Sequence, residues 1–193
     1  ELKRQGPDAD LNFIDTSDIT DMSSLFRGLN IKNIKVNGWD VSNVTEMYDM
    51  FYGCENFNAD LSDWNTSNVE NMAYMFNSCE NFNSDLGSWD VSKVKATAGM
   101  FYKCTKFNAD LSKWDVSNAV NMYNMFHRCT NFNGDVSSWN TGKAVNMDRM
   151  FYGCTNFSCD LSHWDVSSVL DKSRMFGGCP SMEKNPNLQP KFN

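Results

Sequence analysis

Tryptophan recurs in this chain at a fixed interval, and that interval constrains the fold more than any other feature. The six tryptophans lie 25 residues apart, at Trp39, Trp64, Trp89, Trp114, Trp139 and Trp164. A domain with one irregular core does not space its largest side chain so regularly, whereas self-similarity at roughly 20–50 residues is typical of a stacked repeat array. The sequence therefore predicts a solenoid in which each unit adds one layer.

Other side chains follow the same period. A Met-Phe pair and a cysteine come after each tryptophan at constant distances, first at Met50, Phe51 and Cys54. A second phenylalanine returns at Phe57, Phe82, Phe107, Phe132 and Phe157. One unit reads W-[DN]-[VT]-S-x-[VA]-x-x-M-x-x-M-F-x-x-C-x-N-F-N-x-D-L-S-x. The tryptophan and phenylalanine columns are predicted to form a continuous core, which explains 6 Trp, 12 Met and 14 Phe in 193 residues.

The repeat register divides the whole chain. Residues 1–13 are predicted to be a lead-in or cap, and residues 189–193 a tail. The units of the array cover 14–38, 39–63, 64–88, 89–113, 114–138, 139–163 and 164–188. The first and last units are degenerate, as expected where a stack meets water.

Hydrophobic spacing predicts one helix and one strand in each unit. In the second unit the apolar residues between Val44 and Cys54 recur at intervals of three and four, which favours a helix. Around Trp64, residues 62–67 alternate in character, which favours a short strand. We therefore expect an α/β solenoid of about seven units, each with one short parallel strand and one short helix.

The segment WDVSNVTEMYDMFYGCENFNADLSDW, residues 39–64, resembles the 25-residue repeat of the BspA-like leucine-rich-repeat family of bacterial surface proteins, which is also common among mycoplasma lipoproteins. The resemblance covers residues 14–188. It implies a leucine-rich-repeat-like solenoid that is secreted or held at the cell surface. It also implies an adhesin or interaction module whose partners are host or neighbouring-cell surface and extracellular proteins. The chain shows no signal peptide and no anchoring motif, so we expect a mature product or a trimmed segment.

Charge and motifs exclude several function classes. The formal net charge of −7 provides no basic field for nucleic acid, and no apolar run approaches the roughly 18–20 residues of a membrane span. The chain carries no catalytic or cofactor-binding motif. We therefore expect a non-enzymatic interaction module without a cofactor. The alternatives are an inert spacer in a larger surface protein and, less favoured, a carbohydrate-active enzyme.

Two polar columns invite a chemical interpretation. The cysteines are spaced unlike zinc ligands and are expected to be buried small hydrophobes. Cys159, outside the column, is either an exposed thiol or the partner of Cys154 in a disulfide. The aspartates at Asp60 and its equivalents are expected to form local Asx turns. A calcium ladder is the alternative, and we do not favour it because the unit lacks the glycine-rich pattern of calcium-binding coils.

The positions that vary between units are the candidates for partner binding. The proposed set comprises Tyr48, Tyr52, Tyr102, Tyr123 and Tyr152 on the predicted helix face, and Asp63, Lys113 and His163 on the predicted strand face. Tyrosine favours recognition because it combines a large rigid ring with a polar tip. The alternative is that the tyrosines only cover seams between helices. The small residues at 96–99 suggest either a shallow notch or a local packing variation.

Overall fold

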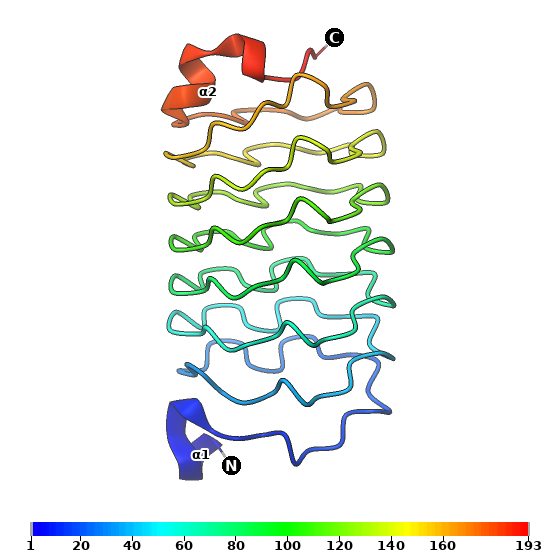
Figure 1. The fold of residues 1–193 in the computed structure, drawn as a ribbon, viewed down its shortest axis with the longest axis vertical. Helices are drawn as coiled ribbons and strands as arrows, with labels where there is room; N and C mark the ends of the chain where they lie inside the picture. The colour runs from blue at the N-terminus through cyan, green and yellow to red at the C-terminus, as the bar shows by residue number, and fades with distance from the viewer. Residues whose placement is uncertain (1, 193) are drawn as a thin grey trace.

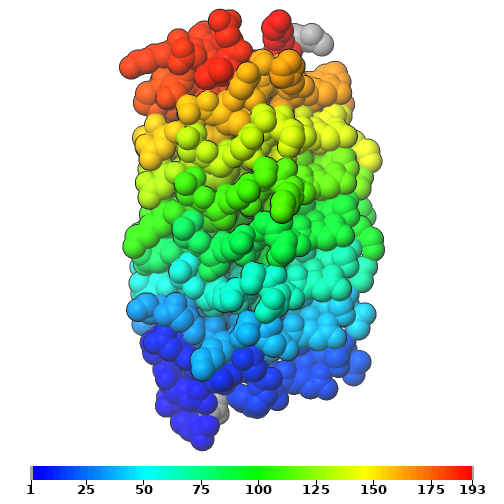
Figure 2. Space-filling view, in the orientation of Figure 1, coloured from blue at the N-terminus to red at the C-terminus, as the bar shows by residue number. Residues whose placement is uncertain are grey.

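The chain winds into a stack of flattened coils with its two ends at opposite ends of the stack (Figure 1). This computed structural model describes residues 2–192. The coils form successive bands in contact with one another when all atoms are drawn (Figure 2). Isolated parallel bridges join each coil to the next along a row at Asp21, Glu46, Asn71, Ala96, Asn121, Asn146 and Asp171, and a further bridge joins Asp10 to Lys35. One repeat of the sequence therefore makes one coil.

Helices occur only at the two ends of the part of the chain that the structure describes. α1 (Leu2–Gln5) and η1 (Gly6–Asp8) precede the coils, and α2 (Pro180–Lys184) and η2 (Pro186–Leu188) follow them. The coils themselves hold isolated bridges and turns. The predicted α/β fold, with a short strand and a short helix in each unit, is therefore wrong. No helix among residues 2–192 is long and apolar enough to cross a membrane.

Tight turns occupy the segment where the sequence predicts a helix. Residues 47–50 and 51–54 form two successive turns, in which the last amide donates to the first carbonyl at 3.3 and 3.0 Å. The third residue of each turn has a positive φ, 47° at Asp49 and 72° at Gly53. Type II turns have this geometry. An α-helix requires negative φ throughout, so these residues cannot be helical.

The turns reproduce the hydrophobic spacing of a helix, which explains the incorrect prediction. Turns also span residues 61–64, 66–69 and 72–75, and the first and last residue of each is buried. Apolar side chains therefore recur at intervals of three, as they do along one face of a helix. The predicted strand at 62–67 is likewise made from parts of two turns.

Backbone groups that the turns leave unpaired bond to the neighbouring coil. The amides of Met47, Asp49, Phe51 and Gly53 donate at 2.7–2.9 Å to the carbonyls of Asn71, Ala73, Met75 and Asn77. Every second amide in this segment thus points toward the next coil, and every second carbonyl accepts from the preceding one. The arrangement is that of a parallel ladder, but turns interrupt it.

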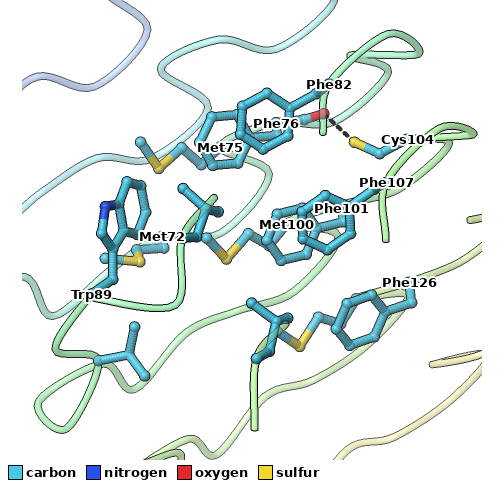
Figure 3. Packing of buried hydrophobic residues seen from close by; sticks show 14 of the residues in the cluster. Met72, Met75, Phe76, Phe82, Trp89, Met100, Phe101, Cys104, Phe107 and Phe126 are labelled. Carbon is cyan, nitrogen blue, oxygen red and sulfur yellow. Dashed lines mark hydrogen bonds between the residues drawn. The ribbon is translucent and has the colours of Figure 1, made fainter. Parts of the chain in front are cut away.

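Aromatic columns fill the inside of the stack, as Figure 3 shows for the middle coils. Phe76 stacks on Phe82 of its own coil at 4.1 Å between ring centroids, and on Phe101 of the next coil at 5.8 Å. Trp64 and Trp89 stack at 6.3 Å. The buried columns are Trp39, Trp64, Trp89, Trp114, Trp139, Trp164, Phe57, Phe82, Phe107, Phe132 and Phe157. Burying one such ring stabilises the fold by about 1.5–3 kcal/mol.

Each buried tryptophan also hydrogen-bonds to the preceding coil, and so does each cysteine of the repeat column. The Trp89 indole Nε1 donates to the Leu61 carbonyl at 3.0 Å. The Cys104 thiol donates to the Phe76 carbonyl at 3.0 Å (Figure 3). Both acceptors lie 28 residues earlier in the chain. An unpaired buried polar group lowers the stability of a fold by about 1–3 kcal/mol. These hydrogen bonds avoid that loss, so the indole N–H and the thiol can be buried in the core.

The two ends of the stack are closed to different extents. At the C-terminal end Met182 of α2 is buried, and the Leu188 carbonyl of η2 accepts a hydrogen bond from the Leu161 amide at 2.8 Å. The predicted last unit therefore ends in this cap. At the N-terminal end the Lys32 amide donates to the Pro7 carbonyl at 2.8 Å, so part of the predicted lead-in lies against the first coil.

Arg128→Gly should stabilise the chain. Arg128 has a φ of 60°, a conformation that costs a residue with a side chain roughly 1 kcal/mol, and Gly153 already occupies the equivalent place in the next coil. In a helix the same substitution would destabilise by about 1 kcal/mol. The free energy of unfolding in urea gives the sign. Lys106→Gly, an exposed position without a positive φ, is the control and should not stabilise; a less stable Arg128→Gly chain would contradict the turn assignment.

Candidate interaction surface

All six tyrosines lie at the middle positions of the two type II turns of each coil, where they are exposed or half-buried, although other residues at such positions are buried. We call this surface the tyrosine face; it consists of Tyr48, Tyr52, Tyr74, Tyr102, Tyr123 and Tyr152 with His127. Turn backbone places the side chains at equivalent points of successive coils. The five tyrosines predicted to bind a partner are thus brought onto one surface, although turns rather than helices present them.

His127 is sandwiched between two tyrosines of the neighbouring coils. The ring centroids of Tyr102 and His127 are 4.7 Å apart, and those of His127 and Tyr152 are 4.9 Å apart. His127 Nδ1 also lies 3.0 Å from Asn124 Oδ1. Both faces of the His127 ring and one face of each tyrosine ring are covered in this stack, so the ring edges and the tyrosine hydroxyls remain for a partner. Such stacking holds the rings in a rigid row.

The surroundings of His127 disfavour its protonation. Burial is the main cause that lowers its pKa from 6.5 to about 4, and the positive charges of Arg128, Arg149 and Lys103 add to the effect. His127 is therefore neutral at physiological pH. Three cations around one neutral ring also make this part of the tyrosine face locally basic, although the chain as a whole is acidic.

Tyrosines fill the small-residue segment of the fourth unit. The Tyr74 ring lies over Gly99, where an added Cβ would come within 2.5 Å of Tyr74 Cδ1. The same ring meets Tyr48 edge-to-face at 5.9 Å. Burial raises the pKa of Tyr74. The suggested notch at residues 96–99 is thus occupied by a neighbouring side chain, and the segment is a packing variation.

Two buried aspartates on this face differ in their pairing. Asp49 is buried and accepts hydrogen bonds from Ser24 Oγ and from the Arg27 guanidinium. Asp148 is also buried, but its Oδ1 has no hydrogen-bond partner among residues 2–192, and its Oδ2 lies 3.7 Å from Arg149 Nη1. An unpaired buried carboxylate oxygen costs free energy. The Asp148 Oδ1 atom is therefore an unused acceptor at the tyrosine face.

The other predicted binding residues lie elsewhere on the coil. Asp63, Lys113 and His163 are exposed at the turn that precedes each tryptophan, equivalent to residues 61–64. They do not join the tyrosine face. Lys113 borders a hollow of about 610 Å³, which aspartates of neighbouring coils also line. The predicted set is thus split between two surfaces.

The aspartates of the Asp60 column form the local turns that the sequence predicts, and a second column, which begins at Asp40, forms turns that were not predicted. Asp60 Oδ1 accepts hydrogen bonds from the Ser62 amide at 3.0 Å and hydroxyl at 2.8 Å, and Asp40 Oδ1 accepts from the Ser42 amide at 2.9 Å. Hydrogen bonds from the Ser62 amide and hydroxyl lower the pKa of Asp60, and hydrogen bonds from the Ser42 hydroxyl and amide lower the pKa of Asp40. Residues 2–192 contain no group of three or more His, Cys, Asp or Glu placed to hold a metal ion.

The cysteines are free thiols. The proposed Cys154–Cys159 disulfide is not formed, because Cys154 is buried and donates its thiol hydrogen to the Phe126 carbonyl at 2.8 Å. Cys159 is half-buried instead, with its sulfur 3.5 Å from Asp135 Oδ1. Burial, with a smaller effect of Asp135, raises the pKa of Cys159. It is therefore neither bridged nor activated.

His127, the central member of the tyrosine face, was not among the residues predicted to bind a partner. His127 stands in the column of Tyr52, Tyr102 and Tyr152, but a single histidine among tyrosines gives no signal of stacking. The cations around it come from three different coils. Asp148 shares a column with Tyr48 and Tyr123. A carboxylate at a position that holds an aromatic ring in other units was the one sequence signal that could have marked Asp148 as unusual. Whether its Oδ1 finds a hydrogen-bond partner depends on residues of the neighbouring coils, so the sequence of one repeat cannot show that this partner is missing.

Asp148→Ala should stabilise the chain by about 1 kcal/mol, because it removes a buried oxygen without a partner. Alanine already stands at the equivalent positions 73 and 98. Asp49→Ala is the matched control and should destabilise, since it leaves Arg27 and Ser24 without their acceptor. Urea denaturation of both variants measures the two signs. A loss of stability in both would show that Asp148 is paired in solution.

His127→Tyr should flatten the dependence of stability on pH between about 6.5 and 4. The folded pKa of His127 lies below its unfolded value, so the unfolded chain binds the proton first and stability falls as pH drops through this window. Tyrosine suits the column and does not titrate there. His163→Tyr, at an exposed turn, is the control and should retain the wild-type slope. Equal slopes for all three chains would refute the assignment.

Comparisons with known proteins place the chain in a family. No curated protein matches it. Among solved structures, the crystal structure of the T. pallidum leucine rich repeat protein is similar at 15% sequence identity and a TM-score of 0.34, over 81% of each chain. A family profile matches residues 3–110 and 85–189, which together span most of the sequence. The chain therefore belongs to the family described as Mycoplasma protein of unknown function, DUF285.

Proposed function

We propose that this chain is a non-enzymatic protein-interaction module displayed at a cell surface, and that the tyrosine face is its binding surface. Membership of the mycoplasma family is compatible with this role, and the resemblance of the repeat to BspA-like surface proteins motivates the adhesive function. The partners are extracellular or surface proteins of a host or neighbouring cell. No cofactor is needed for such binding.

The row of stacked rings on the tyrosine face carries this proposal. Tyr102, His127 and Tyr152 are held by their neighbours, so binding costs little side-chain entropy. Tyr48, 41% exposed, and Tyr123 extend the same surface. The residues of this face change from coil to coil, whereas those of the core columns repeat. Partner choice can therefore be set here without altering the core columns.

One geometric feature favours a specific partner contact. Asp148 lies beside Arg149, one of the three cations that surround His127, and its Oδ1 has no hydrogen-bond partner among residues 2–192. This oxygen is buried in the free chain, so a partner's donor reaches it only after the Asp148 side chain rotates outward, and the new hydrogen bond then removes the cost of leaving the oxygen unpaired. The face thus combines rigid aromatic area with a buried acceptor, the combination found at binding hot spots.

The double variant Tyr48→Ser and Tyr123→Ser should reduce capture of immobilised host extracellular proteins by at least about tenfold, equivalent to ~1.4 kcal/mol. These two side chains avoid the His127 stack, so the melting temperature should change little. The measurement is surface plasmon resonance with purified matrix proteins. The double variant Asp63→Ser and His163→Ser, at the other surface, is the control and should bind as the wild type does.

Three outcomes would contradict the proposal. Equal binding by both double variants would remove the tyrosine face from recognition. Loss of binding only in the control variant would move the site to the turn that precedes tryptophan. Absence of binding by the wild-type chain across extracellular proteins would favour an inert spacer, and turnover of a polysaccharide would favour the carbohydrate-active alternative.

A further inference from the structure

Positive charge gathers on one half of the tyrosine face. Lys103, Arg128, Arg149 and Arg174 follow one another at one cation per coil, each at the third residue of a type II turn. We call these four residues the basic row. Asp148 is the one carboxylate at the middle positions of the same turns in these four coils. Because the whole chain has a formal charge of −7, the basic row reverses the sign of charge locally.

The basic row is only partly neutralised within the chain. Arg149 Nη1 lies 3.7 Å from Asp148 Oδ2, and the other three members form no ion pair among residues 2–192. In the first two coils, by contrast, Arg27 is paired with buried Asp49. Three positive charges thus remain in excess in the later coils. This excess calls for an anionic ligand more than for an internal partner.

Backbone conformation adds a second reason to assign a role to these cations. All four have a positive φ, between 51° and 60°. Gly99 and Gly153 occupy equivalent third positions in other turns, also at positive φ, so glycine fits the backbone of both turns. A side chain at this φ lowers stability relative to glycine, and strain of this kind concentrates at functional sites. The strain therefore favours a role for the cations outside folding.

The basic row lies around the stacked rings. The Arg128 amide donates to the Tyr152 carbonyl at 2.7 Å, and the Tyr152 amide donates to the Arg149 carbonyl at 3.1 Å. Charges of Lys103, Arg128 and Arg149 all act on the His127 ring. These three cations belong to coils that have a neighbour on each side, so their arrangement does not depend on either end of the stack.

A peptide strand cannot pair with this part of the face, because the backbone is already bonded. Every amide from Met122 to Cys129 donates a hydrogen bond, and every carbonyl from Asn121 to His127 accepts one. The amides and carbonyls of an extended acidic peptide would therefore find no backbone partner here. An anionic ligand must be held through side chains alone.

The spacing of the row favours a linear polysaccharide over an extended peptide. Equivalent rings of successive coils are 4.7 and 4.9 Å apart, at Tyr102, His127 and Tyr152, so the coils that carry the cations recur at about this interval. Side chains on one side of an extended peptide recur at about 6.4–6.8 Å. A sugar ring is about as long as one coil is thick, and its hydroxyls can bond to tyrosine hydroxyls.

We propose that the basic row binds a sulfated linear polysaccharide, which lies along the axis of the stack with about one sugar per coil. The planar fork of arginine suits tetrahedral oxyanions such as phosphate, and a sulfate group presents the same kind of oxygens. Sulfate oxygens accept hydrogen bonds from the basic row, and the Tyr102 and Tyr152 hydroxyls bond to the sugar. The proposal rests on the tyrosine face being a recognition surface, and it adds a second class of ligand to the extracellular proteins proposed above.

Titration calorimetry of the intact chain with a heparin oligosaccharide tests this proposal. The wild-type chain should bind, and the double variant Lys103→Gly and Arg128→Gly should bind at least about tenfold more weakly, because charge-assisted hydrogen bonds are lost. Glycine suits the positive φ at both positions, so this variant should melt no lower than the wild type. A loss of binding therefore cannot be ascribed to unfolding.

The matched control is the double variant Lys106→Ser and Lys113→Ser. Both lysines are exposed and lie outside the tyrosine face, so this variant has the same net charge as the glycine variant but retains the basic row. It should bind the heparin oligosaccharide as the wild type does. Equal loss of binding in both double variants would reduce the effect to net charge and overturn the proposal.

Two further probes identify the anion that is recognised. The same oligosaccharide without its sulfate groups keeps its carboxylates and should bind at least about tenfold more weakly. Equal binding of the sulfated and desulfated chains would overturn the proposal, and tighter binding of poly-glutamate would assign the row to an acidic peptide instead. Absence of heparin binding would also overturn it. The proposed function would then still stand if Tyr48→Ser with Tyr123→Ser loses protein capture.

Discussion

The rest of the structure depends on one constraint, that each residue lies beside its own copy in the next coil. Amides in the Met-Phe segment donate to carbonyls of the following coil, and tryptophan and cysteine donate to carbonyls 28 residues earlier. These offsets are constant because every coil has the same length. A side chain that satisfies one coil therefore satisfies all of them, and the core needs few residue types. The abundance of Trp, Met and Phe follows from this geometry.

Type II turns determine where the chain can vary. Their end residues lie in the core and their middle residues lie at its margin, some exposed and some buried as Asp49 and Asn124 are, so variation between coils falls mainly on the tyrosine face and the outer turns. Several third positions hold residues with side chains at positive φ, among them Tyr74, Asn124 and Arg149. Glycine would cost less at each by roughly 1 kcal/mol. Side chains retained at that cost support an interaction role for this surface, since strain of this kind concentrates at functional sites.

Sequence patterns predicted the larger organisation and missed the local conformation. The constant period, the buried columns and the Asx turns all follow from residue identity and spacing. Helix and strand were wrong because paired turn ends repeat every three residues, as a helix face does. Gly53, Gly99 and Asn124 were the signals of positive φ that could have indicated turns. The helix was predicted from the spacing of the apolar residues alone, without regard to these three residues.

For the candidate surface, too, the sequence predicted which residues lie together but not their local contacts. Tyrosines in one column had to meet on one face whichever conformation the unit adopts, so Tyr52, Tyr102 and Tyr152 lie together. Their separation from Asp63 and Lys113 required knowledge of where each turn points. The pairing of Asp49 and the lack of a partner at Asp148 depend on residues one coil away. A repeat motif records only what the units share, so it does not show differences in pairing between equivalent positions of different coils.

The constant offsets between bonded residues have a consequence for how such a protein changes over time. Removing or duplicating one whole repeat between any two equivalent points reconnects every donor to an acceptor of the same type. Losing a single residue displaces a whole coil relative to both neighbours. The length of the molecule can therefore change in whole coils. The exposed surface would lengthen, shorten or be reordered while the packing between neighbouring coils stays the same.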